Sequence, residues 1–269
     1  MYPFIHIGPL TLGSYGLMVA IALICAFFVL RADFARRGVS ADAEAIIGIT
    51  GLAGLAGSRL YHLLETPREF FADPWPQLFS TMGFAFIGAI IGGFFALLIL
   101  AWRFRIKPLL LLDVAAPAAA LGYGIGRIGC LISGDGDYGK PTTLPWGMAF
   151  PHGIVPTTET CVQWGAAPDC RVHPTPIYEF LAALVIFWFL WKLGERCFKT
   201  KAPSGIVFSV YLVLSGISRY LVEIIRINPR SFYGMTNAQA ASVVSIVAGI
   251  ILYLSVRRGP LEPRKPSRA

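Results

Sequence analysis

Three arginines stand where a charge is costly. Arg59, Arg127 and Arg219 lie within or at the ends of long apolar stretches, and a charged side chain in the middle of a bilayer costs about 2.5–3.5 kcal/mol. Any one of them could extend to the lipid headgroups or pair with a buried acid. Arg219 and Glu223 are one helical turn apart and would share a face. Together, these residues predict a polar pocket that binds an anion.

Phosphate is the anion that suits this pocket. A guanidinium group donates parallel hydrogen bonds to two oxygens, so Arg127 and Arg219 would hold a phosphate better than two lysines would. Within a membrane, such a phosphate belongs most simply to a phospholipid. The sequence therefore predicts that Arg127 and Arg219 bind the phosphate of a lipid headgroup.

The composition indicates the elements that must position these charges. Of the 269 residues, 55% are hydrophobic and only 14% are charged, whereas about a quarter of a soluble domain is charged. Seven apolar runs approach the length that crosses about 30 Å of hydrocarbon, at 15–30, 43–64, 79–102, 109–132, 177–193, 206–227 and 238–256. We expect an all-α integral membrane protein with seven transmembrane helices in a single polytopic domain, 1–269.

Basic residues set the expected orientation. Lysines and arginines follow the first, third, fifth and seventh runs, and short loops rich in these residues stay in the cytoplasm. The N-terminus is therefore predicted outside and the C-terminus in the cytoplasm. The net charge of +8 is expected to meet the headgroups of membrane lipids, and no nucleic acid is expected as a partner.

The long loop at 134–174 would then form a small extracytoplasmic head. It contains Cys161 and Cys170, and an oxidising compartment permits a disulfide between them. Two unpaired thiols are the alternative. No metal site is expected, because no pair of cysteines or histidines has ligand spacing on one helix.

Glycine-rich and charged motifs surround the arginines. They are Gly-Arg-Ile-Gly at 126–129, Tyr-Gly at 138–139, His-Pro-Thr-Pro-Ile-Tyr-Glu at 173–179, and Arg-Tyr-Leu-Val-Glu-Ile-Ile-Arg at 219–226. Tyr-Gly-Leu-Met at 15–18, Gly-Ser-Arg at 57–59, Asp113 and Gln239 extend the set. In order and spacing, these motifs resemble the prolipoprotein diacylglyceryl transferase family over almost the whole chain.

The resemblance implies a reaction and a location. It implies transfer of the diacylglyceryl group of phosphatidylglycerol to the lipobox cysteine in the signal peptide of a prolipoprotein, with release of glycerol phosphate and no cofactor. It also implies a multi-pass protein of the bacterial cytoplasmic (inner) membrane. The alternative is a catalytically altered or inactive paralogue that binds phospholipid or lipoprotein precursors.

The resemblance and the residue types together give a candidate site. Arg127 and Arg219 would act on the phosphate, Glu223 would hold Arg219 or the glycerol hydroxyls, and Asp135, Asp137, Asp113 and His173 are candidate bases. The residues expected to bind substrate are Tyr15, Arg59, Asp113, Gly129, Cys130, Gly139, Glu179, Glu223, Arg226 and Gln239.

Four positions depart from the family pattern. Ile87 stands where the family usually has a histidine, Cys130 stands for an asparagine, Asp135 or Asp137 stands for a glutamate, and Ser215 stands for a tyrosine. The nucleophile of the implied reaction is the lipobox cysteine of the substrate. A free cysteine of pKa about 8.5 is already a few per cent thiolate at neutral pH, so a base on the enzyme assists the reaction but is not obligatory. Cys130 is expected to be an ordinary buried side chain, with a covalent lipid intermediate as the alternative.

Overall fold

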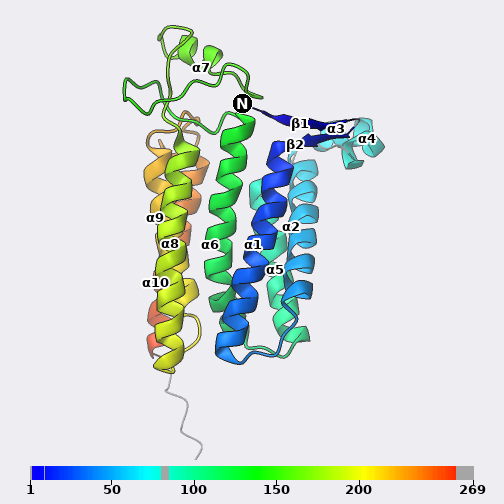
Figure 1. Ribbon diagram of the computed structural model, residues 1–269, viewed down its shortest axis with the longest axis vertical. Helices are drawn as coiled ribbons and strands as arrows, with labels where there is room; N and C mark the ends of the chain where they lie inside the picture. Colours follow the sequence, from blue (N-terminus) through cyan, green and yellow to red (C-terminus); the bar gives the residue numbers. More distant parts are fainter. Residues whose placement is uncertain (1, 9, 80–84, 259–269) are drawn as a thin grey trace, which may run out of the picture. The chain divides into compact units, whose positions relative to one another are not determined.

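Helices dominate the computed structural model, which describes residues 2–8, 10–79 and 85–258 (Figure 1). In this part of the chain, six helices are long and apolar enough to cross a membrane. They are α1 (Ser14–Arg37), α5 (Phe86–Arg103), α6 (Pro108–Ser133), α8 (Thr175–Lys199), α9 (Ile206–Glu223) and α10 (Asn237–Arg258). The protein is therefore a mostly helical, multi-pass membrane protein.

The predicted run at 43–64, which is not among these six helices, corresponds to α2 (Ala43–Glu65), which has 23 residues. It is long enough to cross a bilayer, but the polar side chains of Arg59 and His62 lower its hydropathy. The run predicted at 79–102 falls partly on residues 80–84, which lie outside the described residues, and α5 begins at Phe86.

The run predicted at 206–227 is too long. The helix α9 ends at Glu223, and the backbone N–H groups of Ile224 and Ile225 bond to the carbonyls three residues before them. The chain thus leaves the helix through a tight turn. This early end changes the direction of the side chains that follow, among them Arg226.

A small hairpin at the N-terminus departs from the all-α prediction. Strands β1 (Phe4–Ile7) and β2 (Leu10–Gly13) pair antiparallel, with Phe4 opposite Gly13. Gly8, between the strands, has a φ of +60°, a conformation that glycine adopts without steric cost. The prediction was wrong for these residues, since two strands of four residues carry too short an apolar alternation to be recognised.

Contacts divide the chain into two units, one of residues 30–112 and the other of residues 1–29 and 113–269. In the first unit, α2 packs against α5 through glycines. A Cβ atom on Gly57 would lie 2.5 Å from the carbonyl oxygen of Gly88, so neither position accepts a larger residue without separating the helices. The helices α3 (Pro67–Ala72) and α4 (Pro74–Phe79) follow α2.

In the second unit, α6, α8, α9 and α10 form a helical bundle (Figure 1). Its apolar core includes Ala116, Ala120, Leu190 and Val207. Asp113 fixes one end of this bundle, because its carboxylate accepts hydrogen bonds from the backbone N–H groups of Gly205 (2.6 Å) and Phe208 (2.7 Å). These donors belong to the first turn of α9, which has no intrahelical partners for them.

Residues 134–174 form a lobe beyond one end of α6, α8 and α9 (Figure 1). The lobe contains one short helix, α7 (Thr157–Gln163), and a core of its own built from Tyr138, Phe150, Cys161 and Val172. Cys161 and Cys170 form a disulfide. The lobe therefore combines an apolar core with a covalent link across a short loop.

Candidate active site

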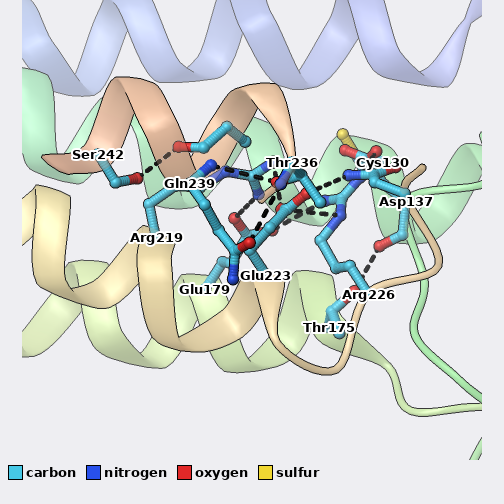
Figure 2. A network of polar contacts seen from close by, with 12 residues as sticks. Cys130, Asp137, Thr175, Glu179, Arg219, Glu223, Arg226, Thr236, Gln239 and Ser242 are labelled. Carbon is cyan, nitrogen blue, oxygen red and sulfur yellow. Dashed lines mark hydrogen bonds and ion pairs between the residues drawn. The ribbon is translucent and has the colours of Figure 1, made fainter. Parts of the chain in front are cut away.

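Three arginines and three carboxylates meet where α6, α8 and α9 approach the lobe (Figure 2). Arg127 comes from α6, Glu179 from the first turns of α8, and Arg219 and Glu223 from the end of α9. Arg226 and Asp137 come from the turns that follow α9 and α6. With all carboxylates ionised, the formal charges of this arginine cluster cancel.

Glu179 is the centre of the arginine cluster. One carboxylate oxygen accepts hydrogen bonds from the Tyr123 hydroxyl (2.5 Å) and from Nη1 of Arg219 (2.6 Å). The other oxygen lies 3.5 Å from Nε of Arg127 and 3.6 Å from Nη1 of Arg226. The side chain is only 1% exposed. Glu179 therefore contacts all three arginines, although the sequence had suggested only a substrate-binding role.

Asp137 joins two of the arginines from the outer side. One of its carboxylate oxygens pairs with Nη1 of Arg127 and the other with Nη2 of Arg226. Burial by itself raises the pKa of Asp137, but the nearby guanidinium groups of Arg226 and Arg127 outweigh it and lower the pKa to about 2. Asp137 therefore stays ionised at neutral pH, and such a stabilised carboxylate is a poor proton acceptor.

Arg226 reaches the cluster because the chain after α9 pairs with the chain after α6. Gly139 and Arg226 form an antiparallel bridge, and the backbone N–H of Lys140 donates to the carbonyl of Ile225 (2.9 Å). A Cβ atom on Gly139 would lie 2.7 Å from the Ile225 carbonyl oxygen. Gly139 is thus a glycine because the backbones approach too closely for a side chain.

Glu223 completes the cluster at the end of α9. Its carboxylate lies 3.0 Å from Nη2 of Arg219, as the spacing of one helical turn predicts, and 3.6 Å from Nε of Arg226. The side-chain amide of Asn228 donates to it at 2.6 Å. Neither Asn228 nor Tyr123 was singled out from the sequence. The sequence could have indicated Tyr123, since it lies four residues before Arg127 on one helix. In the structure its ring contacts the Arg127 guanidinium.

Cys130 and Asp135 lie beside the arginine cluster. Nη1 of Arg127 donates to the buried Cys130 sulfur at 3.8 Å, and ligand atoms of Cys130, Asp135 and Asp137 lie within 4.8 Å of one another. Two arginines already neutralise Asp137, which disfavours a cation there. Burial, followed by the negative charge of Asp137, raises the pKa of Asp135. Of the two aspartates, Asp135 is thus the better proton acceptor near neutral pH.

Two predicted residues lie around the cluster without joining it. Tyr15 packs where α1 crosses α6, and a Cβ atom on Gly129 would lie 3.1 Å from its ring. The His173 ring nitrogen lies 3.2 Å from the Tyr178 hydroxyl, which also accepts a hydrogen bond from Trp146 at 2.8 Å. The structure thus places His173 in an aromatic group with Trp146 of the lobe and Tyr178 of α8.

Three further predicted residues have other surroundings. Asp113 caps α9 and lies about 21 Å along α6 from Arg127, at 1.5 Å per residue. The Gln239 side chain accepts a hydrogen bond from the Thr236 N–H, while the Thr236 hydroxyl accepts one from the Gln239 N–H, a capping box at the start of α10. Arg59 is buried in α2, in the unit of residues 30–112.

Comparison with known proteins agrees with the motifs. A profile of the prolipoprotein diacylglyceryl transferase family matches residues 3–255. A protein of Clostridium tetani is 32% identical over 89% of this chain and 91% of its own length. One of Geobacter sulfurreducens is 30% identical over 97% and 96%, and one of Nostoc sp. is 30% identical over 98% and 92%. All three are named phosphatidylglycerol–prolipoprotein diacylglyceryl transferase.

Proposed function

The chain belongs to the prolipoprotein diacylglyceryl transferase family, and on this premise we propose that its arginine cluster carries out the family's reaction. The chain transfers the diacylglyceryl group of phosphatidylglycerol to the lipobox cysteine thiol in the signal peptide of a prolipoprotein. This is the first step of bacterial lipoprotein maturation. The substrates are thus one membrane lipid and one secreted precursor.

The observation that carries the proposal is the convergence of Arg127, Arg219 and Arg226 on one buried carboxylate. Among the described residues, Nε and Nη1 of Arg226 have no hydrogen-bond partner, and their ion pairs are long, at 3.6 Å. A buried donor without a partner is unfavourable. The carboxylates therefore satisfy Arg226 only in part, and guanidinium groups bind the oxygens of a phosphodiester with charge-assisted hydrogen bonds.

The chemistry follows from the charges. The cysteine sulfur attacks the glycerol carbon of the diacylglyceryl group, a carbon–sulfur bond forms, and the bond from that carbon to the phosphate oxygen breaks. Glycerol phosphate leaves as its phosphate gains negative charge, and preorganised guanidinium groups stabilise that charge. Asp135 accepts the thiol proton. The steps balance without a cofactor.

The proposed placement puts the arginine cluster at the outer surface of the bacterial inner membrane. In this topology α2 crosses the membrane together with the six helices named above, which makes seven spans. The basic ends of α1, α5, α8 and α10 face the cytoplasm, as basic segments do. The N-terminus and the lobe at 134–174 then lie outside, where the disulfide is chemically stable. Phosphatidylglycerol reaches the arginines from the outer leaflet.

A transfer assay tests the proposal directly. The purified protein is incubated with phosphatidylglycerol and a synthetic lipobox peptide, and mass spectrometry measures the mass added to the peptide cysteine. We expect the diacylglyceryl mass with the wild type and none with Arg219→Ala. Arg230→Ala is the matched control, because Arg230 is exposed and donates a hydrogen bond to the backbone carbonyl of Gly234 in its own loop. A wild type that adds no mass contradicts the proposal.

A second candidate function is a non-catalytic paralogue that binds phospholipid. Ile87 favours it, since an isoleucine where the family usually has a histidine cannot move a proton, and the side chain is 47% exposed on α5. Such a protein would bind phosphatidylglycerol in the arginine cluster without modifying the peptide. Lipid binding with no mass added to the cysteine is its expected result in the same assay.

A further inference from the structure

We infer that the carboxylate of Asp137 occupies the position between Arg127 and Arg226 at which the phosphate of the lipid binds. The headgroup of phosphatidylglycerol must therefore displace this carboxylate. The inference rests on the proposed function and adds to it a residue that sets the affinity for the lipid. Asp137 would weaken lipid binding in the wild type. After the carboxylate is displaced, two phosphate oxygens would pair with Arg127 and Arg226 in its place.

The geometry of Asp137 imitates that of a bound phosphate. Its two oxygens pair with different arginines, one with Nη1 of Arg127 and one with Nη2 of Arg226. A phosphodiester offers two free oxygens to guanidinium donors in a comparable arrangement. Both anions therefore use the same donors, and they cannot use them at the same time.

The charge balance also favours exchange over addition. Glu179 and Glu223 are 1% and 0% exposed and hold the inner side of the arginine cluster, whereas the Asp137 side chain is 28% exposed. A phosphodiester carries one negative charge. If it replaces Asp137 the cluster stays neutral, but if it binds in addition, an excess negative charge lies in a largely buried site, which is costly.

The anchoring of Asp137 permits its side chain to leave alone. The Thr175 hydroxyl donates to the Asp137 carbonyl at 2.6 Å, and two residues later Gly139 is bridged to Arg226. Because this hydrogen bond and this bridge both fix the main chain around Asp137, the arginines are released by rotation about the side-chain bonds of Asp137. Such rotations are fast for exposed side chains, and the Asp137 side chain is partly exposed.

Acidity does not release the carboxylate under ordinary conditions. The neighbouring arginines lower the pKa of Asp137 to about 2 against the effect of burial, so it remains ionised at neutral pH. Only another anion can then take its place. The expected competitor is the phosphodiester of the lipid rather than a proton.

Equilibrium binding tests the inference. The full-length protein in dodecyl maltoside micelles is titrated with fluorescent phosphatidylglycerol, and inorganic phosphate is titrated as a competitor. We expect Asp137→Asn to bind both at least fivefold more tightly than the wild type, and Asp137→Glu, which restores the charge, to return towards the wild-type affinity. Asp169→Asn, which removes an exposed carboxylate of the same lobe, should leave both affinities unchanged.

The outcomes separate this inference from the proposed function. If the wild type transfers the diacylglyceryl group but Asp137→Asn and Asp137→Ala both bind the lipid no more tightly, the inference is wrong and the function stands. Tighter binding of inorganic phosphate without tighter binding of the lipid also overturns it. If the wild type neither binds nor transfers phosphatidylglycerol, both fail. Thermal unfolding of each variant verifies that the protein is folded.

Discussion

A group of arginines around a buried carboxylate on α1 and the arginine cluster are built differently. On α1, Asp33 pairs with Arg36 and Arg37, three and four residues further along the same helix. In the arginine cluster, the partners of Glu179 and Asp137 include residues 40 and 89 positions away in the sequence. The ion pairs of the first group join residues of a single helix. The second requires α6, α8, α9 and the lobe to be packed.

The difference distinguishes a structural role from a functional one. Basic residues at the C-terminal end of α1 interact favourably with the helix dipole. Asp33 in addition neutralises part of their charge through its ion pairs with Arg36 and Arg37. Arg219 and Arg226 also have a local partner in Glu223, but the contacts of all three arginines with Glu179 join different segments of the chain. Buried ion pairs seldom stabilise a fold more than apolar residues of similar volume would, so a group assembled from distant segments is better explained by what it binds.

The largest expected effect is that of Arg127→Lys. Lysine keeps the positive charge but loses the planar fork that holds two phosphate oxygens, so the transfer rate should fall by about 10²–10³-fold. Initial rates at saturating lipid measure the effect. Arg36→Lys, the matched change in the local group on α1, should alter the rate by less than about twofold. Full activity of Arg127→Lys would refute the phosphate assignment.

The next largest effect is expected for Asp135→Asn. Removal of a general base typically lowers the rate by about 10²-fold or more. Burial and the nearby Asp137 raise the pKa of Asp135, so in the wild type the rate should fall as the pH drops through this raised pKa and the carboxylate becomes protonated. The pH profile of Asp135→Asn should lack that fall. An identical profile in the variant would remove Asp135 from the reaction.

Glu179→Gln should affect both activity and stability. The amide keeps the size of the side chain but removes the negative charge with which the three arginines pair. Breaking a buried ion pair costs about 3–5 kcal/mol. We expect a kcat more than about tenfold lower and a reduced free energy of unfolding. Thermal unfolding in detergent and transfer rates give the two values. Unchanged stability would show that Glu179 does not hold the arginines together.

The sequence predicted the members of this site better than their roles. The apolar runs and the spacing of Arg219 and Glu223 follow rules that act along one helix. Six of the seven runs correspond to helices that could cross a membrane, and Arg219 pairs with Glu223 as its spacing predicts. Arg226 was expected near the site, but its central position depends on where α9 ends and on the bridge to Gly139. Such backbone pairing between distant segments leaves no periodic signal in the sequence.

Two polar residues in apolar runs have partners in the structure that the sequence did not indicate. Asp113 and Gln239 were predicted to bind substrate from the family resemblance, and a carboxylate or amide within an apolar run is costly unless it has partners. In the structure those partners are backbone N–H groups at the starts of α9 and α10. From sequence alone, an acid that caps a distant helix cannot be distinguished from an acid that binds a ligand.

The lobe provides a smaller effect, on stability rather than chemistry. Replacement of both Cys161 and Cys170 by serine releases a short loop, and a disulfide across a loop of this length contributes about 2–3 kcal/mol. We expect a lower temperature of unfolding and a transfer rate within about twofold of the wild type at 25 °C. Treatment of the wild type with a reductant should reproduce the shift. A large loss of activity in a folded variant would implicate the lobe core in the reaction.

The smallest effect on transfer is expected for Asp33→Asn, which completes the comparison of the two groups. Asp33 is fully buried and pairs with Arg36 and Arg37, so loss of its charge should lower the free energy of unfolding by about 1–3 kcal/mol. These partners share one helix and none belongs to the arginine cluster, so the Michaelis constant for phosphatidylglycerol and the transfer rate should be unchanged. A changed Michaelis constant with little loss of stability would mean that the local group also serves the lipid, and the distinction between the two groups would fail.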